Sequence, residues 1–204
     1  MEIENIKIIE RGTKMETVYI SFDCETVNSD LNKLGLINIG FTAYIEQREN
    51  VGQLSVNFKP LHPADEDTLK WWNSTPELKE SFEKCQVNAL EPKEGMLVIR
   101  DWIQSVSKGR KPLLVCYPTI FDGTILYHYW FTFLGHPNGG RGPGFTIVDI
   151  RSYASGKLGI SYFDASKEKA LKQFVPTDKP HTHTGLDDAE EQMHLYFNIR
   201  DFKN

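Results

Sequence analysis

Two carboxylates one residue apart stand at the end of an apolar run near the start of the chain. The run begins at Val18, and Asp23 and Glu25 follow it with Cys24 between them. Side chains alternate between the two faces of a β-strand, so the two acids point to one face and Cys24 points to the other. Two like charges this close are costly unless a cation lies between them. The stretch therefore predicts one side of a cation site.

Two later segments could complete such a site. Asp122 lies just beyond an apolar run that ends at Cys116, and His183 precedes Asp187 and Asp188 at the start of the last helical pattern. Four carboxylates from three elements, with one histidine, can hold two hard divalent cations such as Mg²⁺ or Mn²⁺. Two ions about 4 Å apart form a clamp for phosphodiester cleavage, in which one ion activates water and the other stabilises the leaving oxygen.

These residues fall into three motifs that resemble those of a known family. Phe22-Asp23-Cys24-Glu25-Thr26 resembles the first motif of the DEDD 3′→5′ exonucleases, and Phe121-Asp122 resembles the second. His183, followed after four residues by Asp188-Ala189, resembles the third motif of the histidine subfamily, DEDDh. The resemblance covers roughly residues 18–199, and it extends to the related exoribonucleases. The segment 68–73, with its Trp-Trp pair, also resembles a helix of phage-type single-strand exonucleases.

The resemblance implies a role for each matched residue. Asp23, Glu25 and Asp188 would hold the ion that binds the nucleophilic water, and Asp23 and Asp122 would hold the second ion, partly through water. His183 would be the general base that takes the water's proton, with Glu25 beside it in the catalytic set. The implied reaction releases 5′-mononucleotides from the 3′ end of single-stranded RNA or DNA. The motif spacing of four residues between the histidine and the aspartate favours Asp188 over its neighbour Asp187 as the ligand.

Substrate contacts are less defined by the sequence. The candidates are Thr26, Trp71, Trp72 and Phe121. Trp71 and Trp72 are neighbours on a helix and cannot share a face, so one is expected in the core while the other could stack on a base, an interaction worth about 1–3 kcal/mol. The family's second motif usually has an Asn four residues before its Asp, where this chain has Pro118. That departure concerns a substrate or structural contact and not the metal ligand.

Each signal also has a simpler interpretation when it is taken alone. An Asp-x-Glu pair is common in solvated turns, and Asp122 alone suits a helix N-cap. Three histidines could form a zinc cluster, although the carboxylates dominate and no cysteine is near; they are His181, His183 and His194. Three lysines could contact phosphate, but a solvated helix face is their default interpretation; they are Lys167, Lys169 and Lys172.

Two rival functions remain open on the sequence. One is a nucleic-acid-binding relative that no longer cuts, which predicts a missing ligand or base, whereas all five positions are filled here. The other is an RNase H-like endonuclease, which does not need the arrangement of His183 and Asp188. The sequence does not distinguish RNA from DNA as the substrate, because no residue can be assigned to a 2′-hydroxyl contact. Members of the family are often dimers, so a homodimer is a further expectation.

Composition limits the partners and the location of the chain. It has 204 residues with a net charge of −5, so it lacks a broad electrostatic attraction for nucleic acid and must hold such a partner locally or through metal. Three widely separated cysteines indicate free thiols in a reducing compartment. No signal peptide and no apolar run of membrane-spanning length is evident. We therefore expect a cytoplasmic protein without a membrane partner.

The elements that must position these residues alternate between strands and helices. Strands are expected over 18–24, 36–44, 52–58, 111–116 and 145–150. Helices are expected over 65–72, 76–85, 92–106, 123–134, 166–174 and 185–199. The expected fold class is α/β, an RNase H-like mixed sheet with an antiparallel three-strand meander plus parallel strands, flanked by helices. Residues 1–16 would be a lead-in, and 17–204 a single domain.

Overall fold

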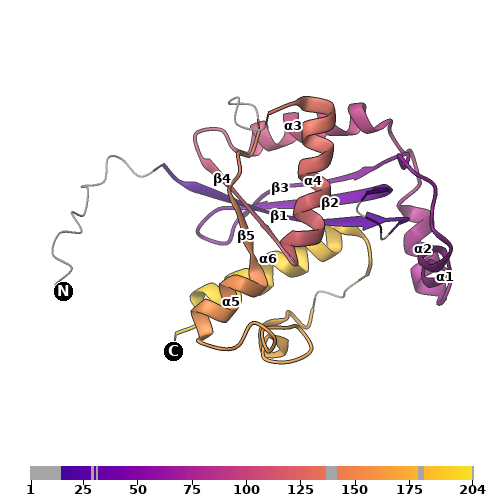
Figure 1. Cartoon of the computed structure of the whole chain (residues 1–204). Coiled ribbons are helices and arrows are strands. Elements are labelled where there is room, and N and C mark those ends of the chain that lie inside the picture. The colour runs from indigo at the N-terminus through magenta and orange to yellow at the C-terminus, as the bar shows by residue number, and fades with distance from the viewer. Residues whose placement is uncertain (1–14, 29, 31, 137–141, 179–181, 204) are drawn as a thin grey trace, which may run out of the picture.

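A five-stranded mixed sheet forms the middle of the molecule (Figure 1). The computed structural model describes residues 15–28, 30, 32–136, 142–178 and 182–203. The strands are β1 (Thr17–Thr26), β2 (Leu36–Tyr44), β3 (Asn50–Asn57), β4 (Lys111–Cys116) and β5 (Ile147–Asp149), in the order β3-β2-β1-β4-β5. The first three strands pair antiparallel, whereas β4 and β5 run parallel to β1. The expected meander with added parallel strands is confirmed.

Helices cover both faces of this sheet. They are α1 (Glu66–Trp72), α2 (Pro76–Lys84), α3 (Pro92–Val106), α4 (Thr119–Leu134), α5 (Ile150–Leu158) and α6 (Gly185–Asp201). α3 and α4 lie on one face, α5 and α6 on the other, and α1 and α2 lie beside one end of the sheet (Figure 1). The expected α/β class, a mixed sheet flanked by helices, is therefore confirmed.

The central strand β1 shows why this arrangement forms. Val18, Ile20 and Phe22 are fully buried in the core beneath α3 and α4, and Tyr19 packs in the second core beneath α5 and α6. A strand covered on both faces is apolar almost throughout its length. Alternation continues to the end of the strand, where Cys24 joins the first core. Asp23 and Glu25 therefore share the face that α6 covers.

Short polar side chains cap the N-termini of α1 and α2. Asp65 accepts a hydrogen bond from the Thr68 N–H at 2.7 Å at the start of α1. Thr75 accepts one from the Leu78 N–H at 3.2 Å at the start of α2, with Pro76 in the first turn. Such caps satisfy amide donors that a helix start leaves without a partner.

Two boundaries near the site differ from expectation. α4 begins at Thr119 and not at residue 123, so Asp122 lies in the first turn and is not an N-cap. β5 is shorter than the expected strand over 145–150, and Ile150 already belongs to α5. Asp149 explains both changes: Oδ1 caps α5 through the Ser152 N–H at 2.7 Å, and Oδ2 accepts from the Thr119 N–H at 2.9 Å.

One other prediction about a helix is wrong. The expected helix over 166–174 consists of turns followed by one 3₁₀ turn at Lys172–Phe174. The expected helix over 92–106 is present as α3, and its buried positions are Pro92, Gly95, Met96, Ile99, Ile103 and Val106.

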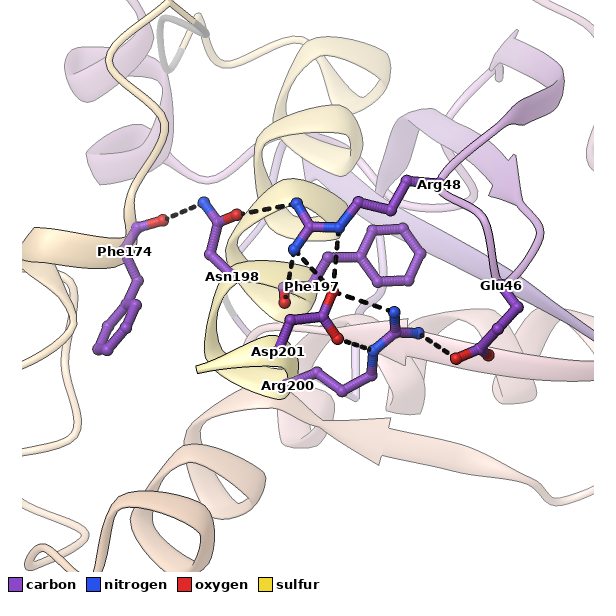
Figure 2. Close-up of polar contacts among 7 residues, drawn as sticks. All are labelled: Glu46, Arg48, Phe174, Phe197, Asn198, Arg200 and Asp201. Atoms are coloured by element: carbon purple, nitrogen blue, oxygen red, sulfur yellow. Dashed lines mark hydrogen bonds and ion pairs between the residues drawn. The ribbon is translucent and has the colours of Figure 1, made fainter. Parts of the chain in front are cut away.

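The far end of α6 is fastened to the turn between β2 and β3 (Figure 2). Arg48 in that turn donates to the Phe197 carbonyl at 3.0 Å, to Asn198 Oδ1 at 3.1 Å and to Asp201 Oδ2 at 2.8 Å. A positively charged arginine at the C-terminal end of a helix suits the helix dipole. The hairpin and α6 are thus held together at the end opposite the predicted site.

Some expectations lie outside the described residues. These are the lead-in up to residue 14 and His181. Among the helices of the described ranges, none combines the length and the apolar character that crossing a membrane requires.

Candidate active site

The first turn of α6 rests directly on the backbone of β1 and β2. A Cβ on Gly185 would lie 2.6 Å from the Gly40 nitrogen and 2.7 Å from the Asp23 carbonyl oxygen, and one on Gly40 would overlap the backbone of Leu186. Gly40 also pairs with Asp23 across the two strands. Asn38 accepts a hydrogen bond from the Gly185 N–H at 2.9 Å, which satisfies one amide of the helix start. The two glycines therefore allow α6 to begin beside Asp23.

This contact brings three predicted site residues together. One ligand atom each of Glu25, His183 and Asp188 lies within 4.8 Å of the other two. Glu25 comes from the end of β1, Asp188 from the first turn of α6, and His183 from the segment just before that helix. Glu25 is 7% exposed and Asp188 is 1% exposed. The three groups could hold a metal ion.

Asp23 lies beside this group and is held by α6. Gln192 Nε2 donates to Asp23 Oδ1 at 2.6 Å, from one helical turn beyond Asp188. Burial raises the pKa of Asp23 well above its usual range, and the negative charges of Asp122, Glu25 and Asp188 raise it further. Asp23 is therefore close enough to the other three carboxyl groups to interact with each of them.

Asp122 reaches the site from the opposite face of the sheet. Its Oδ1 accepts a hydrogen bond from the Cys24 N–H at 3.1 Å, and the side chain is 2% exposed. Burial raises the pKa of Asp122 to about 7, and the charge of Asp188 adds to this, while the Cys24 N–H and Lys167 act against it. The first turn of α4 thus places the fourth carboxyl group at the end of β1.

The donor set suits hard divalent cations. Four carboxyl groups and one imidazole offer oxygen and nitrogen ligands, and oxygen-rich sets favour Mg²⁺ or Mn²⁺. Burial raises the pKa values of Asp23 and Asp122 and neighbouring carboxylates raise them further, so the charged forms of these groups are disfavoured. Cations would remove that penalty, so the residues present fit a metal site.

His183 stands on a fixed backbone. Its φ is 55°, in the left-handed region, and its ring lies edge-on to the ring of Trp71, with centroids 5.0 Å apart. Thr182, just before it, donates its N–H to Asp188 Oδ1 at 3.0 Å, and its carbonyl accepts from Ser81 Oγ at 2.7 Å. Two helices, α2 and α6, therefore hold the residue that precedes the histidine.

Asp187 and Asp188 have different environments. Asp187 is exposed and accepts hydrogen bonds from Thr182 Oγ1 at 2.8 Å and Thr184 Oγ1 at 3.0 Å. Asp188 is buried next to Glu25 and His183. This geometry favours Asp188 as the ligand.

The expected substrate contacts divide into accessible and inaccessible residues. Trp72 is fully buried and donates its Nε1 to the Thr26 carbonyl at 2.9 Å, so it offers no surface for stacking, and that expectation is corrected. Trp71 is 42% exposed beside His183. Thr26 is 9% exposed, and Phe121 is partly buried against the main core.

Several residues that support the site were not predicted from the sequence. Gln192 lies four residues after Asp188, so helical spacing could have placed it on the same face. Asn38 is a polar residue in a buried strand, which was a usable signal. Ser81 carries no local signal, because its partner Thr182 is 101 residues away in sequence.

Solved structures of exonucleases share this fold. E. coli exonuclease I in complex with a dT13 oligonucleotide matches with a TM-score of 0.63 at 13% identity, over 91% of this chain and 41% of that chain. The nuclease domain of 3′hExo, a DEDDh family member bound to rAMP, matches with a TM-score of 0.65 at 12% identity, over 91% of this chain and 90% of that chain. This chain thus spans 41% of exonuclease I and has the RNase H-like fold of DEDDh exonucleases.

One curated relative agrees with these structures. The 3′–5′ DNA exonuclease Cap18 of Escherichia coli is 26% identical over 180 residues, which cover 88% of this chain and 89% of Cap18. No family model matches the chain. The resemblance to 3′→5′ exonucleases seen in the three motifs is confirmed by a relative that spans nearly the whole chain.

Proposed function

We propose that this chain is a metal-dependent 3′→5′ exonuclease that releases 5′-mononucleotides from single-stranded nucleic acid. The observation that carries this proposal is the convergence of Glu25, His183 and Asp188 within 4.8 Å, beside Asp23. Similarity to Cap18 over 88% of the chain and the fold shared with exonuclease I support the same activity.

Four carboxylates are the proposed metal ligands. Asp23, Glu25 and Asp188 would hold one divalent cation, and Asp23 with Asp122 would hold a second, with Mg²⁺ or Mn²⁺ as the expected ions. Bound there, the cations would supply activation of a water molecule and neutralisation of charge on the phosphate. The Cys24 N–H and Gln192 orient two of these carboxylates, so the ligand geometry is set before a cation arrives.

His183 is the proposed general base. A neutral imidazole would take the proton of the attacking water, and a carboxylate oxygen of Glu25 lies within 4.8 Å of that ring. Ser81 and Asp188 hold the backbone of Thr182, which fixes the position of the chain immediately before the histidine. Trp71, edge-on to this ring and 42% exposed, is the accessible surface on which a base at the 3′ end could stack.

Single-stranded DNA is the first substrate to test. Cap18 is a DNA exonuclease by name and aligns with most of this chain, whereas the rAMP-bound 3′hExo domain is 12% identical. A matched RNA strand is the necessary comparison, because the two differ by the 2′-hydroxyl.

A labelled strand separates this proposal from its rivals. With Mg²⁺ or Mn²⁺ and a 5′-labelled single strand, the expected product is a ladder that shortens from the 3′ end. Cuts in a circular single strand would indicate an endonuclease instead. Binding without any cutting would indicate a nucleic-acid-binding relative that has lost catalysis.

Three secondary expectations belong to the same proposal. The exonuclease domain is proposed to span residues 17–204. Cys24, Cys85 and Cys116 are free and buried, which supports a cytoplasmic, reducing location. The homodimer stays a prediction, and light scattering coupled to size-exclusion chromatography measures it.

A further inference from the structure

Lys167 has an environment that the sequence did not suggest. A solvated helix face was expected at this position, but the segment is a turn and the Lys167 side chain is only 19% exposed. Its ammonium forms an ion pair with Glu191 Oε1 at 2.7 Å, and the Glu191 side chain is 3% exposed. Nearby Lys169 differs, since it pairs with Asp164 at 3.2 Å with both side chains more than half exposed.

The ion pair lies at the edge of the carboxylate site. Glu191 follows Asp188 by three residues on α6 and adjoins Gln192, which donates to Asp23 at 2.6 Å. The Lys167 nitrogen lies 5.4 Å from the ring centroid of Tyr117, two residues before α4. The positive charge of Lys167 also lowers the pKa values of Asp23 and Asp122, against the larger effect of burial.

A cavity opens beside the same ion pair. Its volume is about 440 Å³, within the usual range for small-ligand sites, and the residues that line it include Lys167, Lys172, Thr177 and Glu191. The cavity therefore provides open space beside the positive charge of Lys167.

The ion-pair partner of Lys167 gives information about the role of its positive charge. A lysine that served only to neutralise the predicted ligands would pair with one of them. Lys167 forms its ion pair with Glu191, which is not among the predicted ligands. An ammonium has three N–H donors, so one carboxylate oxygen does not exhaust its capacity.

We propose that Lys167, positioned by Glu191, binds the phosphate of the 3′-terminal nucleotide, first as the scissile phosphodiester and then as the 5′-phosphate of the released mononucleotide. The inference rests on the proposed exonuclease function and deepens it by naming a substrate contact. A lysine is a compact charge that suits a phosphate oxygen, and such charge-assisted hydrogen bonds are among the stronger ones. Lys172 lines the same cavity and adds a second positive charge there.

The test compares two lysines of one loop in the full chain. Binding of dTMP, and of thymidine as the ligand without phosphate, is measured by titration calorimetry for the native protein, Lys167→Met and Lys169→Met. We expect Lys167→Met to weaken dTMP binding roughly 10-fold to 100-fold, the range for one charge-assisted hydrogen bond. Thymidine binding should not change, and Lys169→Met should resemble the native protein.

Further variants guard against indirect effects. Lys167→Arg keeps the cation and should restore part of the dTMP affinity, and Glu191→Gln should weaken dTMP binding because the lysine loses its partner. Mn²⁺ affinity should be unchanged or tighter in Lys167→Met. Unchanged dTMP binding in Lys167→Met, or weakened Mn²⁺ binding, would overturn the inference. Failure of the native protein to shorten a single strand would instead remove the proposed function, and the two failures are distinguishable.

Discussion

At the scale of residues, burial governs the protonation of the Asp122 carboxyl group. Its side chain is 2% exposed, and its Oδ1 accepts a hydrogen bond from the N–H of Cys24, 98 residues away in sequence. Burial raises the pKa of Asp122 to about 7, although this hydrogen bond acts in the opposite direction.

The raised pKa of Asp122 predicts how metal-free stability depends on pH. A pKa raised from 3.8 to about 7 means that the folded state binds more protons than the unfolded state between these values. The free energy of unfolding should therefore fall as pH rises from about 4 to about 7. The Asp122→Asn variant should lose the part of this dependence that Asp122 contributes, while Asp23 keeps its own, and it should gain up to about 4 kcal/mol at pH 8, from about 1.4 kcal/mol per pKa unit.

Denaturant unfolding in chelator at pH 5 and pH 8 measures this difference. Adding Mg²⁺ or Mn²⁺ should recover stability at pH 8 in the native protein, because binding to the folded state stabilises it. Equal slopes with pH in the native protein and in Asp122→Asn would contradict the assignment of a buried, crowded carboxyl group.

At the scale of elements, most strands and helices followed from hydrophobic periodicity and caps, and the failures have physical causes. α4 begins earlier than expected because the Thr119 N–H finds its acceptor in Asp149, 30 residues later. The turn segment around residue 166 is held by Lys167 and Glu191, so tertiary contacts outweigh its helical pattern. The close approach of α6 to β2 could not be predicted from the sequence either, because nothing there distinguishes Gly40 from other glycines in strands.

Gly40→Ala should lower the free energy of unfolding by roughly 1–3 kcal/mol or more. Its new methyl group would overlap the backbone of Leu186, and overpacking against backbone has costs of this order. Gly156→Ala is the matched control in α5, where a Cβ has no neighbour within 4 Å. That change should raise stability by roughly 0.4–1 kcal/mol, and both are measured by denaturant unfolding. Stability unchanged in Gly40→Ala would refute the tight contact.

Ser81→Ala tests the support of His183 by α2. Loss of the hydrogen bond to the Thr182 carbonyl should cost roughly 0.5–1.5 kcal/mol of stability. We expect kcat to fall several-fold with KM nearly unchanged, because the base loses its position while substrate contacts remain. Ser105→Ala removes a similar hydrogen bond, to the Trp102 carbonyl on α3, and should leave kcat unaltered. A native kcat in Ser81→Ala would show that α2 does not position His183.

At the scale of the whole molecule, the two ends of α6 have different roles. Its first turns carry Asp188, Glu191 and Gln192 into the site, while its last turn is fixed by Arg48 (Figure 2). Fold class and site location were predictable together, because the three motifs stand at the ends of β1 and the first turns of α4 and α6. The contacts of Arg48 with the last turn of α6 were not predictable, because nothing in the sequence distinguishes Arg48 from other charged residues in turns.

Arg48→Ala should therefore separate stability from activity. Loss of its contacts to the end of α6 should cost about 1 kcal/mol, discounted because Arg48 and Asp201 are substantially exposed. kcat/KM on a single strand should not change. Arg100→Ala, which removes an exposed pair with the adjacent Asp101, is the control and should have little effect on either quantity. A loss of activity at temperatures where Arg48→Ala is fully folded would contradict this separation.

The most direct test of the active site compares two adjacent acids. Asp188→Asn and Asp187→Asn make the same chemical change one residue apart, at a buried and an exposed carboxyl group. With Mg²⁺ or Mn²⁺ and a 5′-labelled single strand, Asp187→Asn should shorten the strand from its 3′ end nearly as fast as the native protein. Asp188→Asn should lose at least about 100-fold in rate while remaining folded. Full activity in Asp188→Asn would contradict the proposed site.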